Sequence, residues 1–352
     1  MARITFVCLF CLTCIMPQMA YSQSGAFDLD RWYGLVDGIR SRAETENISQ
    51  STIDSTLKNI ALIPSILKSD KNQSEFKLTL DEYLERTVNP TRIETGQKMR
   101  KRYPTLLSRV ENRFGVPPHI MLAFWGMESN YGSVKARHRL IDAFFTLIYD
   151  GRRETFFTNQ LLALMHDADK NKLDITDIHG SWAGAMGHFQ FIPTTLNQYG
   201  IDGDGDKRTD IINNLPDAMF SAGNYLNKLG WNKNERIVRR VVLPYDFDLS
   251  LLDGQTKLSL SQWTAMGVTN PDGSALPVLD MTAGLVADVA HVTQMREQAT
   301  LPSPDTVEMD VDIAPQPAII AYLTYPNFYR IKRWNNSNWY AIAIAELADK
   351  LH

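Results

Sequence analysis

Residues 120–127 are apolar on every face of a helix, and this stretch constrains the fold more than any other part of the chain. A surface helix confines its apolar side chains to one stripe, so a helix without a polar face belongs inside a core. Pro117 and Pro118 suit the first turn of such a helix. Glu128 ends the apolar stretch. The sequence therefore predicts a buried helix that carries one carboxylate at its end.

Glu128 is the first candidate for chemistry. A carboxylate at the mouth of an apolar helix loses solvation, so we expect its pKa to rise toward neutrality. A general acid that protonates a glycosidic oxygen at neutral pH needs such a raised pKa. The alternative is a solvated or ion-paired Glu, which is the more common case. The position of Glu128 alone therefore leaves its role open, and its neighbours must decide.

Residues 180–193 form a second constellation, rich in glycine and alanine, with Ser181 and Gln190 as its polar members. Glycines let a backbone approach a bulky ligand closely. Ser181 and Gln190 could then orient a sugar, and Pro193 would open a following helix. A tight packing turn in the core is the alternative. Together with Glu128, the stretch favours a saccharide cleft.

An ordered set of motifs runs through the chain. It comprises Glu-Ser-x-Tyr-Gly at 128–132, Tyr-Asp-Gly-Arg-Arg at 149–153, Gly-Ser-Trp-Ala-Gly-Ala-Met-Gly-x-x-Gln-Phe-x-Pro at 180–193, Asn-Tyr-Leu at 224–226, and Tyr-Pro-Asn-Phe at 325–328 followed by Trp-Asn-x-Ser at 334–337 and Tyr-Ala at 340–341. The set resembles the lytic murein transglycosylase B family, glycoside hydrolase family 103. The resemblance implies a lysozyme-like core with helical and small β additions.

The resemblance also implies roles at the matching positions. Glu128 corresponds to the catalytic acid/base, with Ser181 in hydrogen-bond contact with it. The implied contacts to saccharide or its peptide are Arg152, Arg153, Gln190, Tyr225, Trp334, Asn335 and Tyr340. The family usually has Tyr where this chain has Trp334, which keeps a stacking face but lacks the hydroxyl. Each of these residues taken alone would equally suit a surface, packing or turn position.

The implied activity is a lytic transglycosylase that cleaves the MurNAc–GlcNAc β-1,4 bond of peptidoglycan and forms 1,6-anhydroMurNAc. Most glycosidases use two carboxylates, and the acids nearest the motifs, such as Asp142 and Asp150, are at helix-start or turn positions. In the implied mechanism Glu128 acts alone, assisted by the N-acetyl group of the substrate. The alternatives are a hydrolytic lysozyme-type muramidase and a catalytically inactive cell-wall-binding protein. A zinc amidase is not favoured, because the seven His residues show no paired-ligand spacing.

An acidic loop follows the second constellation. Asp202, Asp204, Asp206 and Asp210 occupy positions 1, 3, 5 and 9 of an EF-hand-like spacing, and Arg208 offers its backbone carbonyl at position 7. Lys207 replaces the usual glycine at position 6, and Asn213 replaces the usual Glu at position 12. Asp217 resembles the closing acid of the longer loop in some family members. We expect a structural Ca²⁺ site and no organic cofactor; the alternative is a solvated Asp/Gly turn.

The first residues predict export. Arg3 precedes an apolar stretch at residues 4–16, and small residues at Ala20 and Ser22 suit a signal peptidase. We expect cleavage after Ser22 and a periplasmic enzyme. All three cysteines fall inside this segment, so the remaining chain must be stabilised by its own core. A lipoprotein anchor at Cys14 is the alternative, and Thr13 is a poor match to the small residue it requires.

The charge balance excludes some partners. The chain has 36 basic and 40 acidic residues, a formal net charge of −4, which gives no footprint for nucleic acid. No second apolar stretch is long enough to span a bilayer. The expected partner is the peptidoglycan glycan strand. Docking to cell-wall synthesis enzymes and the choice between exo- and endo-action stay open.

The chain as a whole is predicted to be α+β, mainly α. We expect a signal peptide at 1–22, a helical N-terminal region at 23–115 and a catalytic core with the acidic loop at 116–235. A β-rich subdomain follows at 236–320, with Asp-Gly turns between short apolar stretches. The part at 321–352 would return to the core. Residues 297–317, rich in proline and acid, are predicted to be a loop or an excursion at the edge of the sheet.

Overall fold

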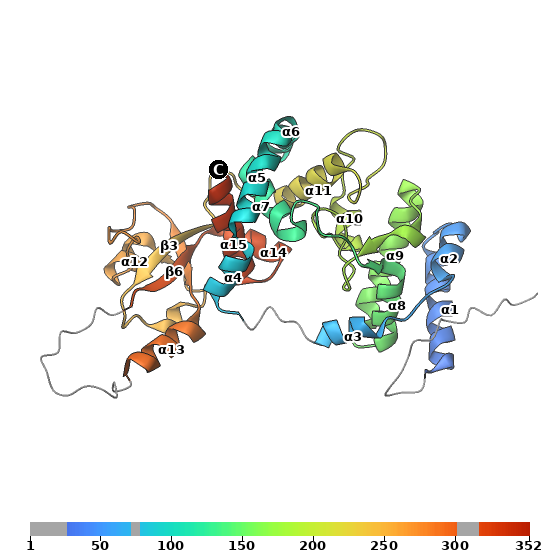
Figure 1. Ribbon diagram of the computed structural model, residues 1–352, viewed down its shortest axis with the longest axis horizontal. Helices are drawn as coiled ribbons and strands as arrows, with labels where there is room; N and C mark the ends of the chain where they lie inside the picture. The colour runs from blue at the N-terminus through green and yellow to red at the C-terminus, as the bar shows by residue number, and fades with distance from the viewer. Residues whose placement is uncertain (1–26, 72–77, 301–316) are drawn as a thin grey trace, which may run out of the picture. The chain divides into compact units, whose positions relative to one another are not determined.

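The structure is a computed structural model that describes residues 27–71, 78–300 and 317–352 (Figure 1). The predicted signal peptide and Cys14 lie outside the described residues. Two compact units are present, each assembled from separate stretches of the chain. The first unit contains residues 27–71 with Lys135–Gln198 and Asp206–Asp210, and the second contains the described parts of Ser74–Val134, Tyr199–Gly205 and Ile211–His352. The predicted division into consecutive domains stays a prediction.

The first unit is built on two long helices, α8 (Leu140–Asp150) and α9 (Glu154–Asn171), which pack together. It also contains α1 (Leu29–Thr45), α2 (Gln50–Leu57), α3 (Pro64–Lys71), η2 (Ile175–Asp177), most of α10 (Pro193–Tyr199) and the two-residue strands β1 (His138–Arg139) and β2 (His179–Gly180). Residues 140–148 of α8 are all buried. Asp142 on this buried face accepts hydrogen bonds from Arg139 and from the Ala61 amide, which anchors the chain before α3 to α8.

The second unit contains the predicted buried helix. This helix is α7 (Pro118–Ser129), and its residues from Ile120 to Gly126 are all buried. Around it pack α5 (Pro90–Arg102), α6 (Pro104–Phe114), α11 (Leu215–Lys228) and α15 (Asn338–Leu351). The same unit holds α4 (Leu80–Thr87) and α14 (Pro326–Trp334). Since α15 buries residues 340–345 and packs against α7, the two most apolar helices of the unit cover each other. The expected return of residues 321–352 to the catalytic core stays a prediction.

A four-stranded antiparallel sheet completes the second unit, with strand order β3-β6-β5-β4; β3 and β6 are labelled in Figure 1. Its strands are β3 (Val238–Leu243), β4 (Leu258–Ser259), β5 (Thr282–Val286) and β6 (Ile319–Thr324). Strand β6, from near the C-terminus, lies between β3 and β5, with Val241 opposite Ala321. Strand β6 spans the predicted domain boundary at residue 320. Its pairing partners in β3 lie some 80 residues earlier in the chain.

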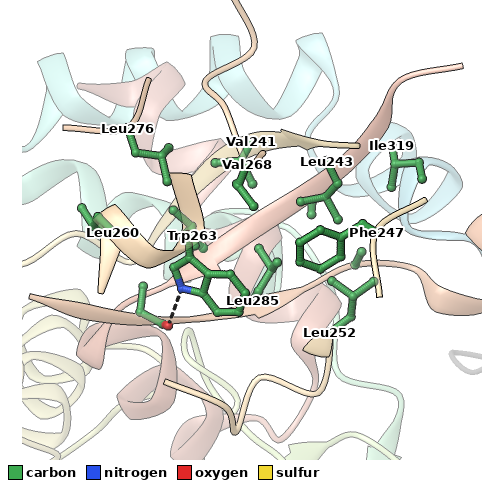
Figure 2. Close-up of a cluster of buried hydrophobic side chains, with 14 of the residues drawn as sticks. Val241, Leu243, Phe247, Leu252, Leu260, Trp263, Val268, Leu276, Leu285 and Ile319 are labelled. Carbon is green, nitrogen blue, oxygen red and sulfur yellow. Dashed lines mark hydrogen bonds between the residues drawn. The ribbon is translucent and has the colours of Figure 1, made fainter. Parts of the chain in front are cut away.

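The sheet has its own hydrophobic core (Figure 2). Trp263 of α12 (Leu260–Ala265) is fully buried there, and its indole Nε1 donates a hydrogen bond to the Ala283 carbonyl at 2.9 Å. Val241, Leu285 and Ile319, from three different strands, belong to the same buried cluster. Apolar burial of this kind, about 25 cal/mol per Å², stabilises a small sheet without disulfide bonds.

The loop prediction at 297–317 is wrong at its start. Helix α13 (Val289–Thr300) continues through residues 297–300, and only from Pro302 onward does proline disfavour a helix. Residues 301–316 lie outside the described residues. Within the part of the chain that is described, no helix combines the length and the apolar character that a membrane crossing needs.

Candidate active site

The end of α7 is a turn of three left-handed residues. Asn130, Tyr131 and Gly132 have φ angles of 47°, 59° and 78°. The amides of Asn130 and Tyr131 donate to the carbonyls of Gly126 and Trp125, which satisfies the last turn of the helix. Because two of the three residues are not glycine, this backbone needs support from side chains. The turn directs the chain away immediately after Glu128.

Tyr131 provides that support from a buried slot between α5 and α7. Its hydroxyl donates to the Arg92 carbonyl at 3.0 Å, and burial raises the pKa of this phenol. Gly96 and Gly126 form the walls of the slot; a Cβ on Gly126 would lie 2.7 Å from the Tyr131 hydroxyl oxygen. The Glu-Ser-x-Tyr-Gly motif therefore fixes the C-terminal end of α7, where Glu128 lies.

Replacing Gly126 by Ala should destabilise the protein by about 1–3 kcal/mol, because the added methyl group overpacks the Tyr131 slot. Urea unfolding measures the change. Gly34→Ala is the matched control: Gly34 is in the interior of α1, with no atom within 4 Å of an added Cβ. That control should gain up to about 1 kcal/mol from helix propensity. Equal effects of the two substitutions would contradict the slot.

The Glu128 carboxylate is held by side chains from two other helices. Tyr340 of α15 donates its hydroxyl to Glu128 Oε1 at 2.5 Å, and Trp334 of α14 donates its indole Nε1 to the same oxygen at 2.9 Å. Tyr340 is buried, and this burial together with the Glu128 carboxylate raises the pKa of the phenol well above its ordinary value. Tyr340 therefore stays a donor at neutral pH, and Glu128 itself is half-buried.

Trp334 belongs to a row of aromatic rings. The Tyr199 and Tyr225 rings stack with centroids 4.4 Å apart, and the Tyr225 and Trp334 rings stack at 4.8 Å. Phe124 of α7 contacts Trp334 from a tilted angle at 4.9 Å. Because Tyr225 has a ring on either face, a saccharide would contact its edge. The row fixes the plane of the indole and hence the direction of its N–H.

The acidic loop brings three carboxylates together in the second unit. Asp202, Asp204 and Asp217 each place an oxygen within 4.8 Å of the other two. Asp217, fully buried at the start of α11, accepts the Gly203 amide at 2.7 Å. A side chain at residue 203 would collide with the backbone of Pro216. Three hard oxygen donors around one point fit a calcium ion.

The remaining predicted metal ligands lie in the first unit. These are Asp206, Arg208 and Asp210. Asp206 accepts the Arg208 amide at 2.8 Å. Lys207, where the usual loop has glycine, adopts φ 71°, the left-handed conformation that glycine would supply. The loop thus makes the expected turn despite this departure.

Ser181 and Gln190 shape the 180–193 stretch in the first unit. Ser181 Oγ accepts the amides of Ala183 and Ala185 at 3.3 and 3.0 Å. Gln190 has φ 49° and donates its side-chain amide to the Gly187 carbonyl at 2.9 Å. The 180–193 stretch is thus a compact turn, which agrees with the alternative prediction of a tight packing turn. The predicted contact between Ser181 and Glu128 stays a prediction.

The comparisons with known proteins bear on this geometry. The family model described as "Transglycosylase SLT domain" matches residues 32–349. The chain belongs to this transglycosylase family. Its fold, mainly helical with small sheets, is the lysozyme-like fold of these proteins, so both the family resemblance and the fold class are confirmed.

The chain is similar to three lytic transglycosylases of known sequence or structure. The membrane-bound lytic murein transglycosylase B of Escherichia coli strain K12 is 30% identical over 269 residues, which is 75% of this chain and 65% of that protein. This chain thus spans just under two thirds of that relative's length. SltB3 from Pseudomonas aeruginosa, solved with NAG-anhNAM-pentapeptide, shares 33% identity with a TM-score of 0.78, covering 91% of this chain and 79% of that one. Escherichia coli Slt35, solved with calcium, shares 25% identity with a TM-score of 0.72, covering 90% and 92%.

Within this transglycosylase fold, sequence reasoning missed Asp70, the shared partner of the two predicted arginines. Arg152 and Arg153 both form ion pairs with Asp70 of α3, whose side chain is only 4% exposed, and Arg152 also pairs with Asp150 at 2.7 Å. The guanidinium groups remain nearly half exposed. Nothing in the sequence around Asp70 signalled this contact, because it joins residues about 80 positions apart. The predicted substrate contact of the two arginines stays a prediction.

Asn335 and Tyr340 have structural roles as well. The Asn335 amide donates to the Ile331 carbonyl at the end of α14, and its carbonyl accepts the Ser337 amide at 2.8 Å. Ser337 in turn caps α15 by accepting the Tyr340 amide. The tight connection between α14 and α15 therefore sets Trp334 and Tyr340 at one oxygen of Glu128. The predicted saccharide contacts of these two aromatic residues stay predictions.

Proposed function

We propose that this chain is a lytic transglycosylase that cleaves the MurNAc–GlcNAc β-1,4 bond of peptidoglycan and forms 1,6-anhydroMurNAc. The observation that carries the proposal is Glu128, which ends the buried helix α7 and is held by Tyr340 and Trp334. Membership of the transglycosylase family supports it. So does the relative SltB3, which was solved with a NAG-anhNAM-pentapeptide.

In the proposed reaction Glu128 acts twice. As an acid it protonates the glycosidic oxygen, and the N-acetyl carbonyl of the substrate stabilises the anomeric carbon. As a carboxylate it then accepts the proton of the muramic C6 hydroxyl, whose oxygen attacks C1. No water enters the product. Ser181, Gln190, Arg152, Arg153, Tyr225, Asn335 and the exposed parts of the aromatic row would bind the glycan and its peptide.

Product analysis on purified sacculi tests the proposal. Mass spectrometry of the released muropeptides should show anhydro products, each lighter by one water than a hydrolytic product. Reducing, hydrated ends would instead make the chain a lysozyme-type muramidase. Binding to sacculi without any released muropeptide would make it a cell-wall-binding protein.

The proposed setting is the periplasm, reached by a signal peptide at residues 1–22. The glycan strands of peptidoglycan are the partner that this activity requires. Association with cell-wall synthesis enzymes is a further part of the proposal. Mass spectrometry of the N-terminus of the protein purified from its own periplasm tests the setting: a terminus at Gln23 is expected, and a diacylated Cys14 would overturn it.

A structural calcium ion is proposed at Asp202, Asp204 and Asp217. It is supported by the three converging oxygens and by the calcium complex of Slt35. The ion would neutralise these acids and join the loop to the start of α11, with no part in the reaction. Asp206, Asp210 and the Arg208 carbonyl are proposed as further ligands.

Calcium should raise the melting temperature of the protein. At a concentration about a hundredfold above the dissociation constant, the gain is about 2.7 kcal/mol, and sub-millimolar affinity is usual for extracellular sites. Asp217→Asn should abolish the gain, because it removes the buried charged ligand. The matched control is Asp272→Asn in an exposed turn, which should respond to calcium as the wild type does. Calorimetry without heat of binding would end the proposal.

A further inference from the structure

A cavity of about 270 Å³ lies in the second unit, at the opposite end of α7 from Glu128. Three elements line it: the first turn of α7, the last turns of α15, and residues 231–238, which connect α11 to β3. His119 of the lining and Glu128 are about 13 Å apart along the helix axis, since a helix rises about 1.5 Å per residue. The cavity is therefore separate from the candidate catalytic carboxylate.

Trp231 brings an unsatisfied donor to this lining. Its side chain is 9% exposed, and its indole Nε1 is buried with no acceptor among the described residues. An indole N–H can only donate. Folded proteins rarely bury such a group unless something accepts from it, because it has lost its hydrogen bonds to water. Since Trp231 lines the cavity, an acceptor bound in the cavity would satisfy this donor.

Two cationic side chains add positive charge to the same lining. Lys233 and Arg236 are exposed, and neither forms an ion pair with another described residue. Glu235, which lies between them in the chain, has its own partners: it pairs with Arg330 at 2.5 Å and accepts a hydrogen bond from Asn232. The charges of the two cations are thus available to an anion in the cavity.

The start of α7 favours an anion as well. Pro117 at the N-cap position offers no capping side chain, and Pro118 has no N–H. The His119 amide is therefore the first donor of a helix whose dipole places partial positive charge at this end. Burial, with His352 and Arg100 nearby, lowers the pKa of the His119 imidazole to about 4, so the ring itself is uncharged at neutral pH. Together with Trp231, this end of the helix suits a carboxylate.

One acid of the lining also lacks a partner of opposite charge. Asp349, in the last turn of α15, is exposed and forms no ion pair within the part of the chain that the structure describes. It does not pair with Lys233 or Arg236, although all three line the same cavity. A ligand that carries an anionic group and a cationic group would complement both sets of charges.

We propose that this cavity is a second binding site, for a small zwitterionic ligand of the amino-acid or dipeptide class. The carboxylate of the ligand accepts the Trp231 N–H and lies beside Lys233 and Arg236, and its ammonium group pairs with Asp349. A peptide fragment of peptidoglycan with a free amine and a free carboxylate has this chemistry, and so has a free dipeptide. The site takes no part in the proposed cleavage and does not depend on it.

Three forms of dialanine test the charge requirement by NMR titration of the whole protein. Dialanine with both ends free should bind with a dissociation constant of about a millimolar, as expected for so small a ligand. Acetyl-dialanine, which lacks the ammonium group, should bind about threefold more weakly, because one exposed charge contact is lost. Dialanine amide, which lacks the carboxylate, should lose about tenfold. Equal binding of all three, or no binding of dialanine, would overturn the proposal.

The indole N–H signal of Trp231 reports on the site itself. It is assigned by its loss from the nitrogen-15 spectrum of Trp231→Phe. In the wild type it should shift as dialanine saturates the protein, because the N–H gains an acceptor. A signal that does not move at saturation would show that dialanine binds elsewhere, and the proposal would fall.

Variants at exposed positions test the same contacts without disturbing the core. Lys233→Gln combined with Arg236→Gln should weaken the binding of dialanine about tenfold. Asp349→Asn should weaken it about threefold and leave the affinity for acetyl-dialanine unchanged, because that ligand has no ammonium group. Lys350→Gln is the matched control, since it removes an exposed cation of α15 that does not line the cavity. Unchanged affinity in the double variant, or an equal loss in the control, would contradict the site.

Competition distinguishes the two sources of the ligand. Displacement of dialanine by peptides that an amidase releases from sacculi would assign the site to cell-wall peptides; dialanine that these peptides do not displace would assign it to free dipeptides. Turnover of sacculi by the Lys233→Gln, Arg236→Gln variant should equal that of the wild type. A wild type without turnover would end the transglycosylase proposal and leave the binding result standing, whereas a wild type that turns over sacculi but does not bind dialanine would end only this inference.

Discussion

Glu128→Gln should lower the release of muropeptides by about a thousandfold or more, since in the proposed reaction Glu128 supplies both general acid and general base catalysis. The amide is nearly isosteric, and its oxygen can still accept from Tyr340 and Trp334. The fold should therefore persist, with a melting temperature close to that of the wild type. Turnover of sacculi, followed by mass spectrometry, and a thermal melt measure the two parts of this result.

Glu44→Gln on the exposed face of α1 is the control for Glu128→Gln. It removes an equal charge and should leave turnover unchanged. Turnover within a few-fold of wild type in the folded Glu128→Gln variant would contradict the assignment. A variant that fails to fold would show instead that the carboxylate is needed to close the cluster of α7, α14 and α15. Glu128→Asp, which keeps the charge, would then test the chemistry.

Asp167→Asn should stabilise the first unit at pH 8 by up to about 4 kcal/mol, because it removes a carboxylate that must ionise in a buried site. Asp167 of α9 is 5% exposed, and burial raises its pKa from 3.8 to about 7. The nearby Asp210 raises it further, while Lys170 and the hydrogen bond from Asn171 oppose the shift. An Asn at this position can still accept that hydrogen bond.

The pH dependence of Asp167→Asn gives the sign of the effect. The folded state holds the Asp167 proton more tightly than the unfolded state, so its contribution to stability is complete below about pH 4 and is lost as pH rises through about 7. The gain of the variant over wild type should grow over this window and level off above it. Urea unfolding from pH 4 to 9, in EDTA so that no bound metal interferes, measures it.

Asp37→Asn on α1 provides the comparison for Asp167→Asn, since Asp37 is exposed. It should change stability by less than about 0.5 kcal/mol at any pH in this range. A flat difference between Asp167→Asn and wild type across pH 4 to 9 would contradict a buried titrating group at residue 167.

The first unit also shows why Asp167 is retained. Asn171, one turn along α9, donates to Asp167 Oδ1 at 2.9 Å and accepts the Thr209 amide at 2.8 Å. The pair thus attaches residues 206–210, the second half of the acidic loop, to α9. Asp167 orients Asn171 for this contact at a cost in stability that the substitution would recover.

Local patterns were enough for the helices. The apolar residues 120–126 predicted a buried helix because a stretch without a polar face has no favourable place at the surface. A helical region was expected at residues 23–115, and α1, α2, α3, α4, α5 and α6 lie within it. The ordered motifs predicted the family and the fold. The spacing of Asp202 and Asp204 predicted two of the three carboxylates that meet in the acidic loop, and the third is Asp217.

The contacts made by Glu128 could not be predicted in this way. Trp334 and Tyr340 are 206 and 212 residues away from it in the chain. Their convergence depends on α15 packing against α7, and many distant contacts must form together for that. Asp70, which binds both arginines, was missed for the same reason. The resemblance assigned the aromatic residues to the saccharide, and the packing gave them a second partner.

The sequence by itself determined a chain of buried and amphipathic helices with Glu128 at the end of the most apolar one, because helix periodicity and solvation act over a few residues. Tertiary structure alone decided which oxygen of that carboxylate is held, and by which donors. Hydrogen bonds require their atoms to meet within about 3 Å, and only the assembled packing of α7, α14 and α15 brings groups so distant in the chain to that separation.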